Sequence, residues 1–334
     1  MRNGIIIGTA HHVPDKVLTN DDLSRILGED ISEFVSTKLG ILERRVLAEN
    51  ESAADLATEA GRKALENAGI TADDVDLIIL ATDTPEYLSP ATSAVVQYRL
   101  GAKRAGTFDV NCACAGFVTA FDTALKYIIA DSNYKNVLVV GVYAMTKFLD
   151  WTEKKTATMF ADGAGAVVLR SVEDSENVDK RGLLTSKLEA DGSYYNFLGI
   201  FAGGSKTPIT HEVINEGYFN KVRFVTKYPP EVNINGWQRI VHELLDRVEL
   251  KLDDIKLFLW TQVNLSTIEI VMKEMDLPMS RTHTIMHKWG YTGSACIPML
   301  LDDAVNAGKI KRNDNLIICA SGGGLNMAAM VYRF

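Results

Sequence analysis

Apolar and polar positions divide this chain into two kinds of segment, as a mixed α/β protein requires. Short, largely apolar runs predict strands buried on both faces, and they lie at residues 4–8, 77–81, 137–141, 166–170, 257–260 and 316–320. Segments with a helical period separate these runs. The clearest of them, 52–68, begins with Ser52 and Asp55 spaced as a capping pair and stops at Gly69.

One helix-to-strand unit occurs twice. Asp-Asp-Val at 73–75 and Asp-Asp-Ile at 253–255 each precede an apolar strand, and they lie 180 residues apart (253 against 73). The strands in KNVLVVG from Lys135 and DNLIICA from Asp314 lie 179 residues apart (314 against 135). Two matches at nearly one spacing favour two similar halves, 1–171 and 172–334. The alternative is that acidic turns before apolar strands recur by chance.

The composition is that of a soluble globular protein with a large core, because 47% of the 334 residues are hydrophobic and 23% are charged. A net charge of -8 disfavours nucleic acid and anionic membranes as partners. The first residues lack the features of a signal peptide, and no uncharged apolar stretch approaches about 18 residues. Four cysteines do not make a disulfide framework in a chain of this length. Together these features predict a cytoplasmic protein.

Cys114 is the candidate for covalent chemistry. The segment from Thr107 starts as a strand, and apolar residues follow at a helical spacing from Phe117 to Ile129. Cys114 is therefore expected at a helix N-terminus, where backbone N–H groups and the helix dipole lower the pKa of a thiol. A thiolate there can attack a thioester and hold the acyl group. The alternative is that Cys114 is a small buried residue that eases a tight turn, as we expect for Cys112.

A zinc site is the competing hypothesis from another class of chemistry. Cys112 and Cys114 together with His283 and His287 supply two thiolates and two imidazoles, which zinc binds. A Cys-x-Cys pair divided between a strand and a helix start points its side chains apart, so we expect no metal. His287 is also a candidate substitute base, but nothing in the sequence fixes its direction.

Four motifs in combination resemble the ketoacyl synthase III enzymes of the thiolase superfamily, and the resemblance spans essentially the whole chain. They are CAGF at 114–117, FADGAGAVVL at 160–169, GYTGSACIP at 290–298 and SGGGLNMAAMVYRF at 321–334. The resemblance implies an α/β, thiolase-like five-layer fold with duplicated mixed-sheet halves, in agreement with the internal repeat. It also implies a homodimer, in which the stretch TPEYLSP at 84–90 crosses to the partner's substrate channel.

Two side chains depart from the family pattern. In the family an acyl-CoA acylates the cysteine, and a His and an Asn then stabilise the enolate formed when a malonyl thioester on carrier protein decarboxylates. The resemblance places Thr261 at the His, in TQVN instead of HQxN, and Tyr291 at the Asn, in GYTGSA instead of GNTxxA. Losing one donor aimed at an oxyanion typically costs about 10²- to 10³-fold in rate. Both replacements remain hydroxyl donors, so we expect them to line the acceptor site.

The resemblance also implies where the thioester binds. The backbone N–H groups of Cys114 and Gly323, the middle glycine of the late triplet, would hold the oxyanion of the acylation step. Phe34 and Lys38 match the family's Trp and Arg at the mouth of the CoA tunnel, and Asn264 keeps its family identity. No permanently bound cofactor is expected, because CoA or phosphopantetheine thioesters are the substrates.

The helix that docks carrier protein in the family is basic, whereas the matching stretch here is not. Residues 265–275 hold a single lysine, Lys273, beside two glutamates, which gives little electrostatic steering of an acidic carrier protein. Acyl-CoA is therefore the favoured donor, and acyl carrier protein is a further candidate partner.

We therefore expect an acyltransferase that forms an acyl thioester on Cys114 and passes the acyl group on. The transfer is either plain acyl transfer, which the replaced residues favour, or a Claisen-type condensation in lipid or specialised metabolism. One alternative is the standard decarboxylative 3-oxoacyl-ACP synthase III reaction. Another, from a different class, is a catalytically silent partner subunit, against which the retained cysteine and glycine triplet argue.

Overall fold

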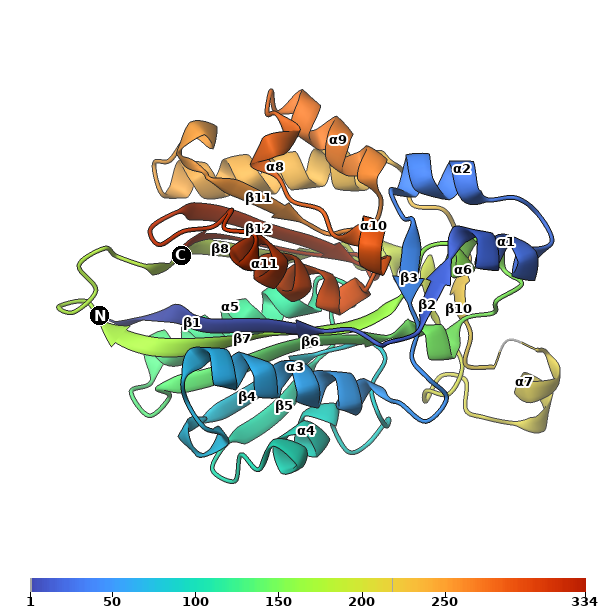
Figure 1. Ribbon diagram of the computed structural model, residues 1–334, viewed down its shortest axis with the longest axis horizontal. Helices are drawn as coiled ribbons and strands as arrows, with labels where there is room; N and C mark the ends of the chain where they lie inside the picture. Colours follow the sequence, from blue (N-terminus) through green and yellow to red (C-terminus); the bar gives the residue numbers. More distant parts are fainter. Residues whose placement is uncertain (1, 218) are drawn as a thin grey trace.

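Two mixed β-sheets form parallel layers in the computed structural model, which describes residues 2–217 and 219–334 (Figure 1). The strands of the N-terminal sheet are β1 (Arg2–His12), β4 (Leu77–Ala81), β5 (Gly106–Val110), β6 (Asn136–Ala144) and β7 (Asp162–Glu173), in the order β1-β7-β6-β4-β5. Those of the C-terminal sheet are β8 (Gly182–Ala190), β11 (Leu257–Trp260), β12 (Asn315–Gly322) and β13 (Asn326–Arg333), in the order β11-β12-β13-β8. In each sheet parallel strands adjoin antiparallel ones.

Helices cover both sheets and fill the space between them (Figure 1). α3 (Ala53–Ala68) and α4 (Thr92–Leu100) lie outside the N-terminal sheet, and α8 (Glu231–Arg247) and α9 (Leu265–Glu274) lie outside the C-terminal sheet. α5 (Gly116–Ala130) and α11 (Cys296–Asn306) lie between the sheets. The layers therefore follow the order helix, sheet, helix, sheet, helix, which is the five-layer arrangement expected from the sequence.

The two halves repeat one local contact at equivalent places. The side-chain amide of Asn136 donates to the Asp74 carbonyl at 3.0 Å, and that of Asn315 donates to the Asp254 carbonyl at 3.1 Å. These bonds join the acidic turns to the neighbouring parallel strands, β6 and β12. The expected fold class with duplicated halves is confirmed, whereas the division after residue 171 stays a prediction, since β7 runs on to Glu173.

The strong local signals in the sequence correspond to the elements that form. The backbone N–H of Ser52 donates to the Asp55 carboxylate at 2.8 Å, α3 starts at the next residue, and Gly69 ends it with a left-handed φ of 66°. β4 and β11 have the bounds that their apolar runs predict, and β1, β6, β7 and β12 extend beyond theirs.

α5 is the most apolar helix of the middle layer. The window Ala113–Ala130 is long and apolar enough to cross a membrane by length and composition alone, yet 61% of it is buried inside the protein. α5 contacts strands of both sheets. It is therefore a core helix whose two sides are covered by different halves of the molecule.

Shorter elements lie at one end of the layers, on the side where the strands lead into the functional site (Figure 1). They are β2 (Val17–Thr19), α1 (Asn20–Leu27), α2 (Ser32–Phe34), β3 (Glu43–Arg45), α6 (Lys154–Ala157), β9 (Leu198–Ile200), α7 (His211–Asn215), β10 (Val222–Phe224) and α10 (Met286–Trp289). A π-helical turn, Val35–Leu39, continues α2.

Candidate active site

Cys114 lies in a tight turn that connects β5 to α5. Ala113 has a φ of 47°, which is unusual for a residue with a side chain. The turn is closed by the Ala115 N–H, which donates to the Cys112 carbonyl at 3.1 Å, and by the Gly116 N–H, which donates to the Ala113 carbonyl at 2.9 Å. α5 begins at Gly116, so Cys114 stands at the start of a helix, where the sequence places it.

The late glycine triplet packs against this turn. A Cβ on Gly322 would lie 2.5 Å from the Cys112 carbonyl oxygen and 2.7 Å from the Cys114 nitrogen, so no side chain fits at this position. Gly323 lies beside the turn at ordinary contact distance, since a Cβ on it would lie 3.9 Å from the Ala113 Cβ. The triplet therefore brings backbone of the C-terminal half to the nucleophile, although the oxyanion role of the Gly323 N–H remains a prediction.

Thr261 follows β11 directly and is 1% exposed. Its hydroxyl oxygen accepts a hydrogen bond from the Ser321 N–H at 2.9 Å, which ties it to the residue before Gly322. In the described ranges, 2–217 and 219–334, no acceptor takes the Thr261 hydroxyl proton. Thr261 therefore retains one proton to donate.

Tyr291 is held in place by the FADGAG segment. Its backbone N–H donates to the Met159 carbonyl at 3.1 Å, and its carbonyl accepts from the Ala161 N–H at 2.9 Å. Its ring stacks on Phe160 at 5.8 Å between centroids. The side chain is 3% exposed, and its hydroxyl forms a hydrogen bond with the thiol of Cys114. Tyr291 thus lies directly beside the nucleophile.

The acidity of Cys114 differs from the sequence expectation. Burial raises the pKa of the Cys114 thiol well above its ordinary value, the negative charge of Asp83 adds to this, and the hydrogen bond from Tyr291 lowers the pKa by less. The expected lowering at the helix start is therefore wrong for this structure, because desolvation of a thiolate outweighs the nearby N–H groups. A raised pKa disfavours the thiolate, which is the nucleophilic form, near neutral pH.

Asp83 is a site residue that the sequence analysis missed. It follows β4 by two residues, its Oδ1 is buried without a hydrogen-bond partner, and burial raises its pKa to about 6. Its position at the carboxyl end of a central parallel strand, beside the strand that leads to Cys114, was an available signal, because sites in α/β sheets gather at such ends.

Two further residues near Cys114 carry no sequence signal of this kind. The thiol of Cys296, at the start of α11, is fully buried, and burial raises its pKa to about 12. The hydroxyl of Tyr228 is buried without a hydrogen-bond partner, 3.9 Å from where a Cβ on Gly323 would lie. Tyr228 stands in a segment without periodicity, so only the structure reveals that it faces the glycine triplet.

The residues expected at the cofactor tunnel lie on neighbouring surface elements. Phe34 is 52% exposed at the end of α2, and Lys38 is exposed one turn later. Gly40 packs against α9, because a Cβ on it would lie 2.7 Å from that of Leu265. The side chain of Asn264 caps α9 by accepting from the Thr267 N–H at 2.7 Å. Asn264 therefore has a structural role, and its role in binding remains a prediction, as do those of Phe34 and Lys38.

The histidines of the zinc hypothesis lie in a different network. His283 contacts Asp303 at 2.7 Å and Lys309 at 2.9 Å. Burial, followed by the charge of Lys288, lowers the pKa of His287. Within residues 2–217 and 219–334, no three His, Cys, Asp or Glu side chains form a group that could hold a metal. The structure thus does not bring these histidines together with Cys112 and Cys114.

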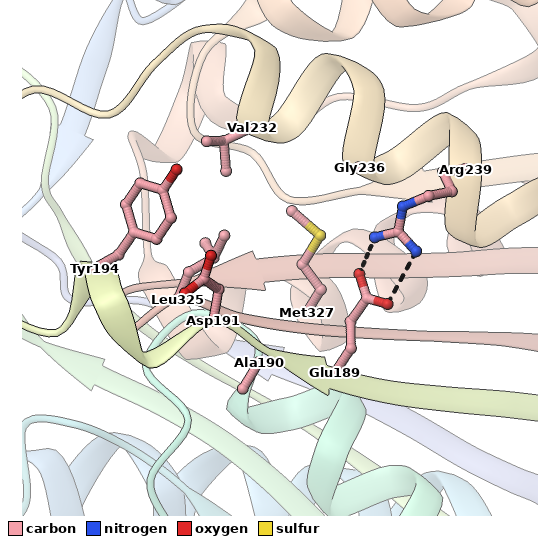
Figure 2. A pocket seen from close by; sticks show the side chains of 9 residues that line it. All are labelled: Glu189, Ala190, Asp191, Tyr194, Val232, Gly236, Arg239, Leu325 and Met327. Atoms are coloured by element: carbon pink, nitrogen blue, oxygen red, sulfur yellow. Dashed lines mark hydrogen bonds and ion pairs between the residues drawn. The ribbon is translucent and has the colours of Figure 1, made fainter.

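A separate pocket of about 370 Å³ lies between the end of β8 and α8 (Figure 2). Figure 2 shows Arg239 paired with Glu189 on one side and Tyr194 on the other. The Tyr194 ring stacks on Tyr228 at 5.7 Å, and Leu325, which also lines the pocket, follows the glycine triplet. The pocket is therefore linked to the site through Tyr228 and Leu325, and Cys114 does not line it.

Comparison with known proteins identifies the family. The model named 3-Oxoacyl-[acyl-carrier-protein (ACP)] synthase III matches residues 108–192, and its C-terminal counterpart matches 245–334. The chain is 38% identical over 329 residues to a beta-ketoacyl-[acyl-carrier-protein] synthase III of Xanthomonas campestris pv. campestris, covering 98% of each chain. The chain belongs to the 3-oxoacyl-[acyl-carrier-protein] synthase III family.

Other members of the synthase III family support the same assignment. A relative from Listeria innocua serovar 6a is 37% identical over 332 residues, covering 99% of each chain. The crystal structure of the synthase III from Aquifex aeolicus VF5 has a TM-score of 0.88 at 33% identity, covering 99% of this chain and 100% of that one. The family and the thiolase-like fold expected from the sequence are confirmed, and the protein is an enzyme of the acyltransferase class.

Proposed function

We propose that this synthase III family member takes an acyl group from an acyl-CoA onto Cys114 and joins it to a second substrate by a Claisen-type condensation. The observation that carries the proposal is the Cys114 turn. A buried thiol lies at the start of α5, the Tyr291 hydroxyl contacts it, and the glycine triplet is packed against its backbone.

The first half-reaction uses features that are intact. Attack of the Cys114 sulfur on a thioester places negative charge on the carbonyl oxygen, and backbone N–H groups can hold it at no cost in reorganisation. We assign this role to the N–H groups of Cys114 and Gly323. Gly322 supports the assignment, because its lack of a side chain lets the triplet approach the Cys114 nitrogen.

The second half-reaction rests on Thr261 and Tyr291. The sequence by itself favours plain acyl transfer, because the family's His and Asn are replaced, whereas the names of the relatives favour condensation. We therefore place condensation first and plain transfer second. The free proton of Thr261 supports a role in holding a developing enolate or an acceptor hydroxyl.

Surface features support acyl-CoA as donor and a second copy of the chain as partner. Lys38 offers a positive charge for a CoA phosphate beside exposed Phe34. β5 forms an edge of its sheet, and the nearby side chains of Tyr87, Leu88 and Tyr98 are 55%, 82% and 84% exposed. An unpaired strand edge flanked by apolar side chains favours pairing with another copy, which would carry the 84–90 loop to the partner's site.

The deciding experiment has two steps. Intact-protein mass after incubation with a series of acyl-CoAs should show one acyl adduct on the wild type, and a protein without any adduct would be the catalytically silent subunit. The acylated enzyme is then given malonyl-CoA and, separately, malonyl carrier protein. Release of carbon dioxide above the level without enzyme supports decarboxylative condensation, and its absence alongside loss of the adduct to another acceptor supports plain transfer.

A further inference from the structure

One acidic side chain near Cys114 has a buried oxygen without a partner. Within residues 2–217 and 219–334, Asp83 Oδ1 forms no hydrogen bond, although the residue as a whole is partly exposed. A buried carboxylate without a partner is costly to the fold, so its presence calls for another explanation. The environment provides a comparison in Asp162, which is also buried but accepts from the Leu47 N–H at 2.8 Å, from the Thr146 N–H at 2.9 Å and from the Thr146 hydroxyl.

The sheet brings the carboxyl end of β4, which leads to Asp83, close to the turn that contains Cys114. Ala81, the last residue of β4, pairs with Val110 of β5 and Gly141 of β6. The Ala81 Cβ lies 3.3 Å from where a Cβ on Gly116 would be, so this face of the strand meets the start of α5. Asp83 lies two residues beyond Ala81, in a bend at the carboxyl end of β4. The electrostatic influence of Asp83 on both Cys114 and Tyr143 agrees with this placement.

The loop that carries Asp83 is fixed in position. The Thr84 N–H donates to the Thr82 hydroxyl at 3.0 Å, and the Thr84 hydroxyl accepts from the Ala144 N–H at 2.8 Å. These bonds hold the loop against the end of β6, beside Tyr143. A fixed carboxylate whose charge acts on a thiol that does not ionise readily is suited to serve as a general base, directly or through one water.

We propose that Asp83 is the acid–base residue of the Cys114 half-reaction. The Asp83 carboxylate accepts the thiol proton while the Cys114 sulfur forms a bond to the thioester carbonyl carbon. The tetrahedral intermediate then collapses, the bond from that carbon to the CoA sulfur breaks, and Asp83 returns the proton to the departing CoA thiolate. The sum is acyl-S-CoA plus cysteine thiol giving acyl-S-cysteine plus CoA thiol, so no further reactant is needed.

Few other groups near Cys114 have a pKa near 6 and could therefore be mistaken for Asp83 in a plot of acylation rate against pH. Among the described residues, the titratable side chains around Asp83 and its neighbours are Cys114, Tyr143, Tyr228, Tyr291, Cys296 and Asp162. Burial raises the pKa of each of these thiols and phenols, which takes them further from neutrality. Asp162 has a pKa of about 6, like Asp83, so it is the necessary control.

The test measures single-turnover acylation of wild type, Asp83→Asn and Asp162→Asn by one reactive acyl-CoA between pH 5 and pH 9. Wild type should reach a plateau with a midpoint near the pKa of Asp83, about 6. Asp83→Asn should lose this midpoint and acylate about 10²-fold more slowly at pH 7, whereas folded Asp162→Asn keeps the midpoint. Asp83→Ser, which is smaller and uncharged, should behave as Asp83→Asn does.

The possible outcomes distinguish an Asp83 that accepts the thiol proton from an Asp83 that only contributes negative charge. If Asp83 acts only through its charge, removing that charge lowers the thiol pKa, and Asp83→Asn acylates as fast as wild type or faster, which overturns the proposal. Alkylation by iodoacetamide at pH 9 should be at least as fast in Asp83→Asn as in wild type, and its loss would show a damaged site and also overturn it. The proposal rests on acylation of Cys114. Wild type without an adduct therefore overturns both proposals, whereas an adduct that forms equally in Asp83→Asn overturns this one alone.

Discussion

The turn before α5 and the start of α11 occupy equivalent places in the two halves, yet they carry different chemistry. α5 begins at Gly116 and α11 at Cys296, 180 residues apart (296 against 116), and both helices lie in the middle layer. Cys114 is 8% exposed beside Asp83 and Tyr291, whereas Cys296 is fully buried. We therefore expect the neighbouring acid, hydroxyl and access, and not the helix start alone, to determine which of the two cysteines reacts.

The largest expected effect tests this contrast directly. Cys114→Ala should remove the acyl adduct completely, because Cys114 is the thiol that is influenced by both Asp83 and Tyr291. Cys296→Ala, the matched change at the other helix start, should leave the adduct in place, with a rate within about threefold of wild type. Intact-protein mass with one acyl-CoA measures both. An adduct that persists in Cys114→Ala would show that Cys114 is not the nucleophile.

The acceptor side can be changed toward the family pattern. A double variant, Thr261→His with Tyr291→Asn, restores the two donors that hold an enolate oxyanion in the resembling enzymes. Carbon dioxide release from malonyl thioesters should rise by about 10²-fold, since each such donor typically contributes this much or more. No rise in a variant that melts like wild type would show that these positions do not limit decarboxylation.

A smaller effect is expected from the bond between Tyr291 and Cys114. Tyr291→Phe keeps the ring on Phe160 and removes only the hydroxyl, which favours the thiolate. The thiol pKa should rise further, and alkylation by iodoacetamide at pH 8 should slow by about 5- to 10-fold, which corresponds to the loss of one hydrogen bond. The rate measured against pH gives both quantities. An unchanged profile would mean that the hydroxyl serves the acceptor instead.

The last prediction concerns the stability of the two buried aspartates and not a reaction rate. The pKa of Asp83 is raised to about 6, so folding disfavours its charged form, and this cost is complete above pH 6 and disappears as the pH falls toward 4. Asp83→Asn should therefore be more stable than wild type at pH 8, by at most about 2–3 kcal/mol, and equal to it at pH 4. Asp162→Asn relieves the same cost, because the pKa of Asp162 is also raised to about 6, but its new amide faces the backbone N–H donors of Leu47 and Thr146, so it should be less stable than Asp83→Asn by about 1–3 kcal/mol. Apparent melting temperatures at fixed scan rate test both signs.

The sequence predicts most of the fold because its central strands and capped helices have strong local signals. β4, β11 and α3 follow from apolar runs and caps. β8 and β13 were not predicted, because β13 follows a glycine triplet and β8 mixes polar with apolar residues without a bounding turn signal. Their strand character comes from pairing with each other and with β12, and such long-range pairing is invisible to local patterns.

Some residues of the candidate site could be predicted from the sequence and others could not, again because local patterns do not report long-range contacts. Cys114 is recognisable because its chemistry and its helix start are encoded in adjacent residues. Asp83 and Tyr228 lie in loops far from Cys114 in sequence, and only the parallel pairing of β4 with β5 and the stacking of Tyr228 on Tyr194 bring them to it. The direction of the Cys114 pKa was wrong because burial cannot be read from the residues around the turn.

The position of α5 has a consequence for how the protein can be assembled or cut. This helix is apolar enough to enter a lipid bilayer, and it is kept in water only because one sheet covers it from each half. The N-terminal half expressed alone would expose the apolar face of α5 that the C-terminal sheet covers, so it should aggregate or associate with detergent. We therefore expect the duplicated halves to fold as one cooperative unit, because each half needs the other to cover α5.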